Sequence, residues 1–150
     1  MKVFISYCDD DGQTFAADAA TILEGHGHKA WYFARDKSTG MLRAVDITNQ
    51  IRYWCDKVLY LCTGGSVSSG GQWKEIGQWD STIKQILVIP INGALVPDVI
   101  EPYVYTTISG SNFKVDFDMF VRNRWEDVTK NYEEWTLKIK VKDTVRATLP

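Results

Sequence analysis

Short apolar runs recur along the chain, separated by longer segments in which apolar residues recur at helical spacing. The first run, KVFISY, is rich in β-branched and aromatic residues, which favour strands. The third, KVLYLC, shows no polar alternation, as expected of a strand covered on both faces. The pattern predicts five strands: Lys2–Tyr7, Lys29–Phe33, Lys57–Cys62, Gln85–Ile91 and Tyr103–Ile108. A further run, Leu137–Val141, alternates with lysine like a charged edge strand.

The intervening segments carry helix signals. Phe15, Ala19, Ile22 and Leu23 follow i, i+4, i+7 and i+8 spacing and therefore share one helix face. The acidic residues at 9–11 are cap candidates for this helix. The predicted helices run from these acids to about Glu24, and over Arg43–Trp54, Ser69–Ser81 and Asp116–Val128. The polar, glycine-containing segment Arg35–Leu42 is predicted to be a loop.

Strands that alternate with helices at this spacing indicate βαβ units. We therefore expect an α/β fold of the flavodoxin-like kind, with a five-stranded parallel sheet and helices on both faces. The chain shows no internal repeat or linker, so residues 1–150 are expected to form a single domain.

Composition narrows the class of protein. Apolar residues make up 45% and charged residues 24%, which is ordinary for a soluble globular domain. The formal charge of −2 gives no reason to expect nucleic acid or an anionic membrane as a partner. No segment resembles a signal peptide or is long and apolar enough to span a bilayer. A cytoplasmic location is therefore expected.

The cysteines and histidines predict neither a disulfide framework nor a metal site. Cys8, Cys55 and Cys62 are odd in number and lack CxxC spacing, which suits a reducing cytoplasm. Cys55 and Cys62 are expected in the core, and Cys8 is expected to be exposed. His26 and His28 have no third ligand nearby and are expected in a loop.

The stretch Ser66–Asp80, SVSSGGQWKEIGQWD, carries the candidate chemistry. Ser69 and Gln72 have the spacing of a capping box. Glu75 then falls in the second helical turn, where the helix dipole favours the ionised carboxyl. Ligands of α/β sheets bind outside the carboxyl ends of the strands. We therefore predict Glu75 as the catalytic residue, whereas Trp73 is expected in the core.

These features together resemble a Toll/interleukin-1 receptor (TIR) domain of the bacterial kind. Phe4–Tyr7, followed by acids, looks like the family's opening FISY box. Trp31–Asp36, followed by glycine, looks like its second strand leading into a mobile loop. Ser66–Trp79 falls where the family carries a Ser-rich loop, a tryptophan and a catalytic glutamate. The resemblance covers about residues 2–110.

One departure concerns the family's tryptophan, which usually lies four residues before the glutamate. Position 71 is glycine here, and Trp73 lies only two residues before Glu75. Two residues rotate a helix by about 200°, so Trp73 is predicted to face away from Glu75, whereas Trp79 shares its face. The segment GGQWKEIGQW is also similar to the glutamate motif of nucleoside deoxyribosyltransferases.

The resemblance implies cleavage of the nicotinamide–ribose bond of NAD+, with Glu75 as the catalytic group. Because the nicotinamide ring is already cationic and leaves as a neutral molecule, one carboxylate suffices. The products would be ADP-ribose or a cyclic isomer, and in bacterial relatives such products serve as signals in antiphage defence. NAD+ is expected as a substrate and no cofactor is expected, because the GxGxxG fingerprint is absent.

Seven further residues are candidates for substrate binding: Phe4, Ser6, Tyr7, Arg35, Asp36, Ser66 and Trp79. The first three close the first strand, where an aromatic ring is a candidate to stack on a base. Arg35 is available to a diphosphate. Ser66 is available to a ribose hydroxyl. Each also has a structural interpretation, as a packing residue, a surface ion pair or a loop residue.

Two alternatives remain open at this stage. One is a nucleoside 2-deoxyribosyltransferase-like N-glycosidase. The other is a non-catalytic signalling module, since TIR domains also act through self-association.

Overall fold

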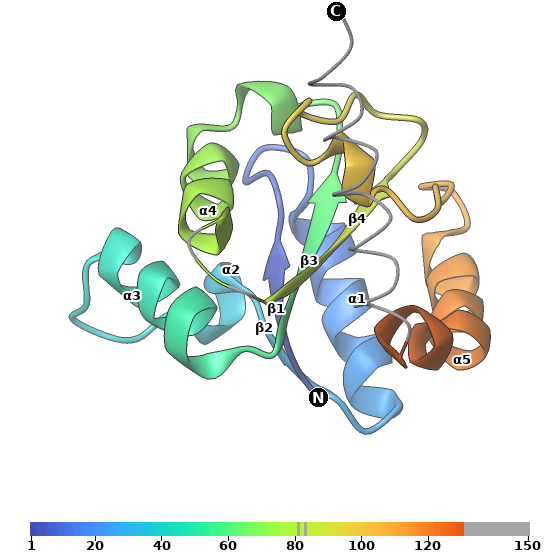
Figure 1. The fold of residues 1–150 in the computed structure, drawn as a ribbon, viewed down its shortest axis with the longest axis horizontal. Coiled ribbons are helices and arrows are strands. Elements are labelled where there is room, and N and C mark those ends of the chain that lie inside the picture. The colour runs from blue at the N-terminus through green and yellow to red at the C-terminus, as the bar shows by residue number, and fades with distance from the viewer. Residues whose placement is uncertain (81, 83, 131–150) are drawn as a thin grey trace, which may run out of the picture.

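The computed structural model describes residues 1–80, 82 and 84–130. Its sheet is parallel, with the strand order β2-β1-β3-β4 (Figure 1). The strands are β1 (Lys2–Ser6), β2 (Lys29–Trp31), β3 (Lys57–Cys62) and β4 (Gln85–Pro90). The chain passes outward from β1 to β2 and then returns to build β3 and β4 on the other side. The carboxyl ends of β1 and β3 therefore form the topological switch point, where α/β sheets bind their ligands.

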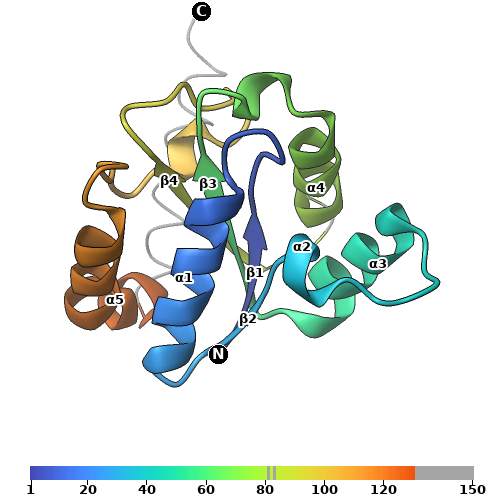
Figure 2. The ribbon, with the colours of Figure 1, turned by 180° about the vertical axis from the view of Figure 1, so that it is seen from behind.

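Helices cover both faces of this sheet, as predicted. The α-helices are α1 (Gln13–Gly25), α2 (Phe33–Asp36), α3 (Arg43–Asn49), α4 (Gly70–Asp80) and α5 (Phe113–Lys130). A π-helical turn, η1 (Gln50–Trp54), and two 3-10 turns, η2 (Ser66–Ser68) and η3 (Glu101–Tyr103), complete the described elements. In Figure 1 and, from behind, in Figure 2, α1 and α5 lie on one side of the sheet and α3 and α4 on the other.

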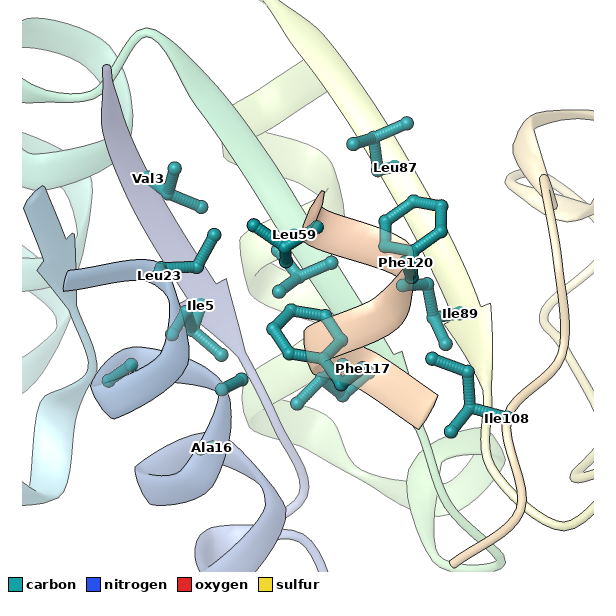
Figure 3. Packing of buried hydrophobic residues seen from close by; sticks show 14 of the residues in the cluster. Val3, Ile5, Ala16, Leu23, Leu59, Leu87, Ile89, Ile108, Phe117 and Phe120 are labelled. Carbon is teal, nitrogen blue, oxygen red and sulfur yellow. The ribbon is translucent and has the colours of Figure 1, made fainter. Parts of the chain in front are cut away.

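Two apolar cores result because successive strand residues point to opposite faces. Val3 and Ile5 of β1 pack with Leu23 of α1 and Phe117 of α5, as Figure 3 shows. Phe4 belongs to the second core, with residues of α4 and η1. Each side chain of β3 and β4 is buried, which confirms the prediction that these runs are covered on both faces.

The prediction of a fifth strand over Tyr103–Ile108 was wrong. Val104 and Ile108 form only isolated parallel bridges, to Val88 and Ile91. Pro90 explains part of the failure, because it has no N–H to donate to a neighbouring strand. The carbonyls of Val88 and Pro90 accept the amides of Tyr105 and Ile108. The two accepting residues are two positions apart on β4, whereas the two donating residues are three positions apart on the next segment. This difference in spacing interrupts the regular hydrogen-bond ladder.

Several predicted boundaries also shift. The second strand stops at Trp31, because the next residues turn into α2, where the Asp36 carboxylate accepts the Tyr32 amide at 3.0 Å. The predicted loop Arg35–Leu42 therefore begins inside a helical turn. The last described helix starts at Phe113 rather than Asp116, since the buried Phe113 ring stacks on Phe117 with ring centres 5.3 Å apart.

The predicted acidic cap of the first helix was also wrong. Gly12 occupies the N-cap position of α1 without a side-chain cap. The Asp11 carboxylate instead accepts the Thr63 hydroxyl and, at 2.9 Å, the Gly65 amide. The run Leu137–Val141 lies outside the described residues. Within them, no helix is both long and apolar enough to cross a membrane.

Candidate functional site

The segment between β3 and Glu75 is held by local hydrogen bonds. The Ser66 hydroxyl accepts the Thr63 amide at 2.9 Å, and the Ser69 hydroxyl accepts the Gln72 amide at 3.2 Å. The second bond is the capping interaction that the sequence predicted. The reciprocal half of the capping box does not form, because the Gln72 side chain turns inward toward the sheet.

Glu75 also turns inward, and its side chain ends in a buried hydrogen-bond network. The residue is 6% exposed. The hydroxyl of Ser6, the last residue of β1, donates to Oε2 of Glu75. The Gln72 amide group donates to the Ser6 Oγ at 3.3 Å and to the Leu61 carbonyl at 3.1 Å. Ser6, Gln72 and Glu75 are therefore called the carboxyl network, which lies where β1 and β3 end.

Burial dominates the electrostatics of Glu75. Desolvation raises the pKa of its carboxyl to about 8, while the Ser6 hydrogen bond and the charge of Arg43 act to lower it. The charge of Asp9 raises it further. Burial therefore outweighs the helix dipole, which the sequence analysis expected to favour the ionised carboxyl. A helix terminus contributes about 0.3–1 kcal/mol, whereas burying a charge costs several.

Arg43 is a site residue that the sequence did not indicate. Its guanidinium lies 4.2 Å from the ring centre of Phe33 and 2.8 Å from the Asp9 carboxylate. Its Nη2 would be 3.9 Å from a Cβ at Gly71, one helical turn before Glu75. Arginine at a helix start is common, and only the fold brings α3 beside α4 and places Arg43 next to Asp9, which follows β1.

Two buried polar atoms near the carboxyl network lack partners among the described residues. They are the Oε1 of Gln72 and the hydroxyl of Tyr60. Tyr60 pairs with Ser6 in the register of β1 and β3, so both side chains point to the α4 side of the sheet. An unpaired buried polar group costs about 1–3 kcal/mol, and such groups call for an explanation.

The predicted residues of the first strand divide between the two faces. Ser6 meets Glu75, and Phe4 lies on the same face, where it stacks on Trp31 with ring centres 5.2 Å apart. Tyr7 lies on the opposite face, and its hydroxyl accepts the Ala34 amide at 3.0 Å. The structure therefore brings Ser6, but not Tyr7, to the carboxyl network.

Arg35 and Asp36 are held away from this network by other partners. The Arg35 guanidinium pairs with Glu24 at 2.7 Å and with Asp36 at 2.9 Å, and it donates to the Ala30 carbonyl at 2.8 Å. Asp36 also accepts the Tyr32 amide. These contacts tie both side chains to α1, α2 and β2.

The two tryptophans of α4 behave differently. Trp79 is buried, shares the inward face with Glu75 and donates its ring N–H to the Lys84 carbonyl at 2.7 Å. Trp73 is 43% exposed, so the prediction that it belongs to the core was wrong. Its ring N–H donates to the Val67 carbonyl at 2.9 Å, which holds it over the preceding loop. The predicted opposite orientation of Trp73 and Glu75 is confirmed.

A shallow hollow of about 330 Å³ lies at the same edge of the sheet, on the α1 side. Asp11, Thr63 and Asn92 are among its lining residues. Cys8 lies beside this edge but is buried, contrary to the exposed position predicted for it, because Gly65 packs against its Sγ. In the described part of the chain, no three His, Cys, Asp or Glu side chains are close enough together to hold a metal ion.

Comparison with known proteins places the fold. No curated protein matches the sequence. The TIR domain of the Toll-related receptor TRR-2 from Hydra magnipapillata has a TM-score of 0.67 and 21% identity, over 85% of this chain and 97% of that one. The TIR domains of the activated Roq1 resistosome, which recognises the pathogen effector XopQ, have a TM-score of 0.57 and 15% identity, over 92% and 80%. The family model for the TIR domain matches residues 3–131, and the chain therefore belongs to the TIR-domain family.

Proposed function

We propose that this TIR domain is an NAD+ nucleosidase in which Glu75 acts on the bond between nicotinamide and ribose. The observation that carries the proposal is the hydrogen-bonded carboxyl of Glu75 at the switch point of the sheet. Ser6 fixes the carboxyl and Gln72 fixes Ser6, so the reactive group is oriented before any substrate arrives. Such preorganisation is a major source of catalytic power.

The chemistry needs one carboxylate. The bond between the ribose C1′ and the ring nitrogen breaks, and its electron pair neutralises the nicotinamide ring, which leaves without a proton. The Glu75 carboxylate stabilises the positive charge that develops on the ribose, or bonds to C1′. Water then attacks C1′ and releases a proton, giving ADP-ribose, whereas attack by a nucleophile within the same molecule gives a cyclic isomer.

Substrate binding itself favours the reactive form of Glu75. With a pKa of about 8, the unliganded carboxyl is mostly protonated at pH 7. A cationic nicotinamide ring beside it lowers the pKa, because an opposite charge stabilises the carboxylate. A nucleoside with a neutral base would not lower the pKa of Glu75 in this way. The side chain is buried in this conformation, so the substrate must displace neighbouring groups to reach it.

The unpaired Gln72 Oε1 and Tyr60 hydroxyl support a polar ligand at this position. Ribose hydroxyls donate and accept hydrogen bonds and are suitable partners for both atoms. Three free cysteines among the described residues suit a reducing compartment such as the cytoplasm. In that setting, ADP-ribose or its cyclic isomer would serve as a signal to a separate effector, and we propose a role in bacterial antiphage defence.

Incubation of the protein with NAD+, followed by mass spectrometry, tests the proposal. We expect released nicotinamide together with ADP-ribose or a cyclic isomer. Glu75→Gln should reduce the rate by at least about 100-fold, whereas the matched control Glu101→Gln, which changes an exposed glutamate, should retain it. Full turnover by a folded Glu75→Gln protein, or exchange of bases between deoxynucleosides without action on NAD+, would refute the proposal.

A second candidate function is assembly without catalysis. Four large apolar side chains are exposed on and beside α3 and η1: Met41, Leu42, Val45 and Tyr53. Leu42 is 76% and Tyr53 is 79% exposed, and exposed apolar side chains on neighbouring elements are candidates for an interaction site. Light scattering should show larger particles for the wild-type protein than for Leu42→Asp. Equal particle sizes over a concentration series would remove this candidate.

A further inference from the structure

We infer that Arg43 binds the diphosphate of a dinucleotide whose ribose reaches Glu75, and so selects dinucleotides over nucleosides. The inference rests on the proposed function of Glu75 and adds the residue that recognises the diphosphate of the substrate. It also assigns the diphosphate to Arg43 in place of Arg35, which the sequence analysis listed as available to a diphosphate.

The position of Arg43 follows from Gly71. A Cβ at Gly71 would lie 3.9 Å from the Nη2 of Arg43, so the guanidinium covers the first turn of α4. Glu75 lies four residues later on the same helix face. A substrate whose ribose contacts Glu75 and which extends toward the start of α4 therefore passes the guanidinium. The missing side chain at position 71 leaves room for it.

The guanidinium is both fixed and accessible. Its central carbon lies over the Phe33 ring, 4.2 Å from the ring centre, and this cation–π contact helps to hold it in place. The side chain is 42% exposed. In the described part of the chain, its ion pair is with Asp9 alone, through Nη2 at 2.8 Å. The remaining N–H groups are available for a bidentate contact with phosphate oxygens.

A bound phosphate would replace Asp9 as the ionic partner of Arg43. An exposed ion pair with one carboxylate is weak, and a diphosphate brings two negative charges and more acceptor oxygens. The start of α4 adds the positive end of a helix dipole. Exchange of Asp9 for a diphosphate is therefore favourable.

Arg35 lacks these properties. Its guanidinium already contacts two carboxylates and the Ala30 carbonyl. Binding a diphosphate there would break an ion-pair network that ties α1 to α2 and β2. Of these two arginines, Arg43 is the one beside the helix that carries Glu75.

The test measures ADP-ribose binding by calorimetry and NAD+ cleavage by nicotinamide release. Arg43→Gln should weaken ADP-ribose binding about 10- to 100-fold, the effect of losing charge-assisted hydrogen bonds. It should lower kcat/KM for NAD+ relative to nicotinamide riboside, which has no diphosphate, by a similar factor. Arg43→Lys keeps the positive charge but loses the planar guanidinium with its two parallel N–H donors. Its ADP-ribose affinity and its kcat/KM ratio should therefore lie between those of the wild-type protein and Arg43→Gln. Arg122→Gln, on α5 and paired with Asp118, is the matched control and should change neither quantity.

The outcomes separate the two hypotheses. Unchanged ADP-ribose binding by Arg43→Gln, loss of binding in Arg35→Gln instead, or no binding by the wild-type protein would overturn the role of Arg43. An absence of nicotinamide release, with Arg43-dependent binding of ADP-ribose intact, would overturn the nucleosidase proposal and leave the diphosphate site standing. Binding needs no turnover, so an inactive preparation still tests the inference.

Discussion

The Glu75→Gln variant should become increasingly more stable than the wild-type protein as the pH rises from 5 to 8. The substitution keeps the shape of the side chain and an oxygen that accepts the Ser6 hydroxyl, but removes the ionisable proton. In the wild-type protein, burial raises the pKa of this carboxyl from 4.5 to about 8. The folded state therefore holds a proton that the unfolded chain releases above pH 4.5.

The sign and size follow from linkage between protonation and folding. The stability associated with the neutral carboxyl is fully present below pH 4.5 and is lost progressively as the pH rises to about 8. At about 1.4 kcal/mol per pH unit, this interval corresponds to an upper limit of about 5 kcal/mol. Total stabilities of domains are about 5–15 kcal/mol, so even half of this limit is readily measured.

Urea denaturation of both proteins at pH 5, 6, 7 and 8 measures the effect. The free energies of unfolding should nearly coincide at pH 5 and should then diverge, with the Glu75→Gln variant the more stable. Glu101→Gln should follow the wild-type curve, because Glu101 is exposed. A difference between wild type and Glu75→Gln that stays constant from pH 5 to pH 8 would show that burial does not hold this carboxyl neutral.

Two further predictions concern the carboxyl network and the turn before α1. Ser6→Ala removes the donor to Glu75, so kcat for nicotinamide release should fall about 10- to 100-fold, and an unchanged kcat would exclude this role. Gly12→Ala should cost about 1–3 kcal/mol in urea denaturation, because its Cβ would lie 2.9 Å from the Cys8 carbonyl oxygen. Gly25→Ala, where a Cβ meets nothing within 4 Å, is the matched control, and equal effects would contradict the steric argument.

The apolar pattern predicted the strands that are covered on both faces. Lys57–Cys62 was predicted with its observed limits, because six consecutive buried side chains leave a continuous signal. The Gln85 strand differs by one residue at its end. The Tyr103–Ile108 segment failed as a strand, since its pairing depends on whether β4 can donate hydrogen bonds to it. Pro90 belongs to the partner strand, and its effect is absent from the segment's own pattern.

The candidate site was predicted only in part for a similar reason. The helix start at Ser69 and the opposite orientation of Trp73 and Glu75 follow from local rules, and the structure agrees with both. The protonation of Glu75 depends on what covers it, and that cover comes from segments distant in sequence. The local sequence predicted Gln72 as a capping residue. In the folded chain its side chain contacts Ser6 instead, and the local sequence gives no sign that Ser6 lies within reach.

The sequence by itself determined the order of the four paired strands and of the longer helices between them, the α/β class and the resemblance to TIR domains, because periodicity and end signals act within a few residues. It did not indicate α2, and it predicted a fifth strand that does not form. Tertiary structure decided the rest. It decided that Cys8 is buried, that Arg35 is committed to Glu24, and that Arg43 lies beside Gly71. Charges, burial and steric fit depend on which distant segments meet, and a linear pattern does not specify those contacts.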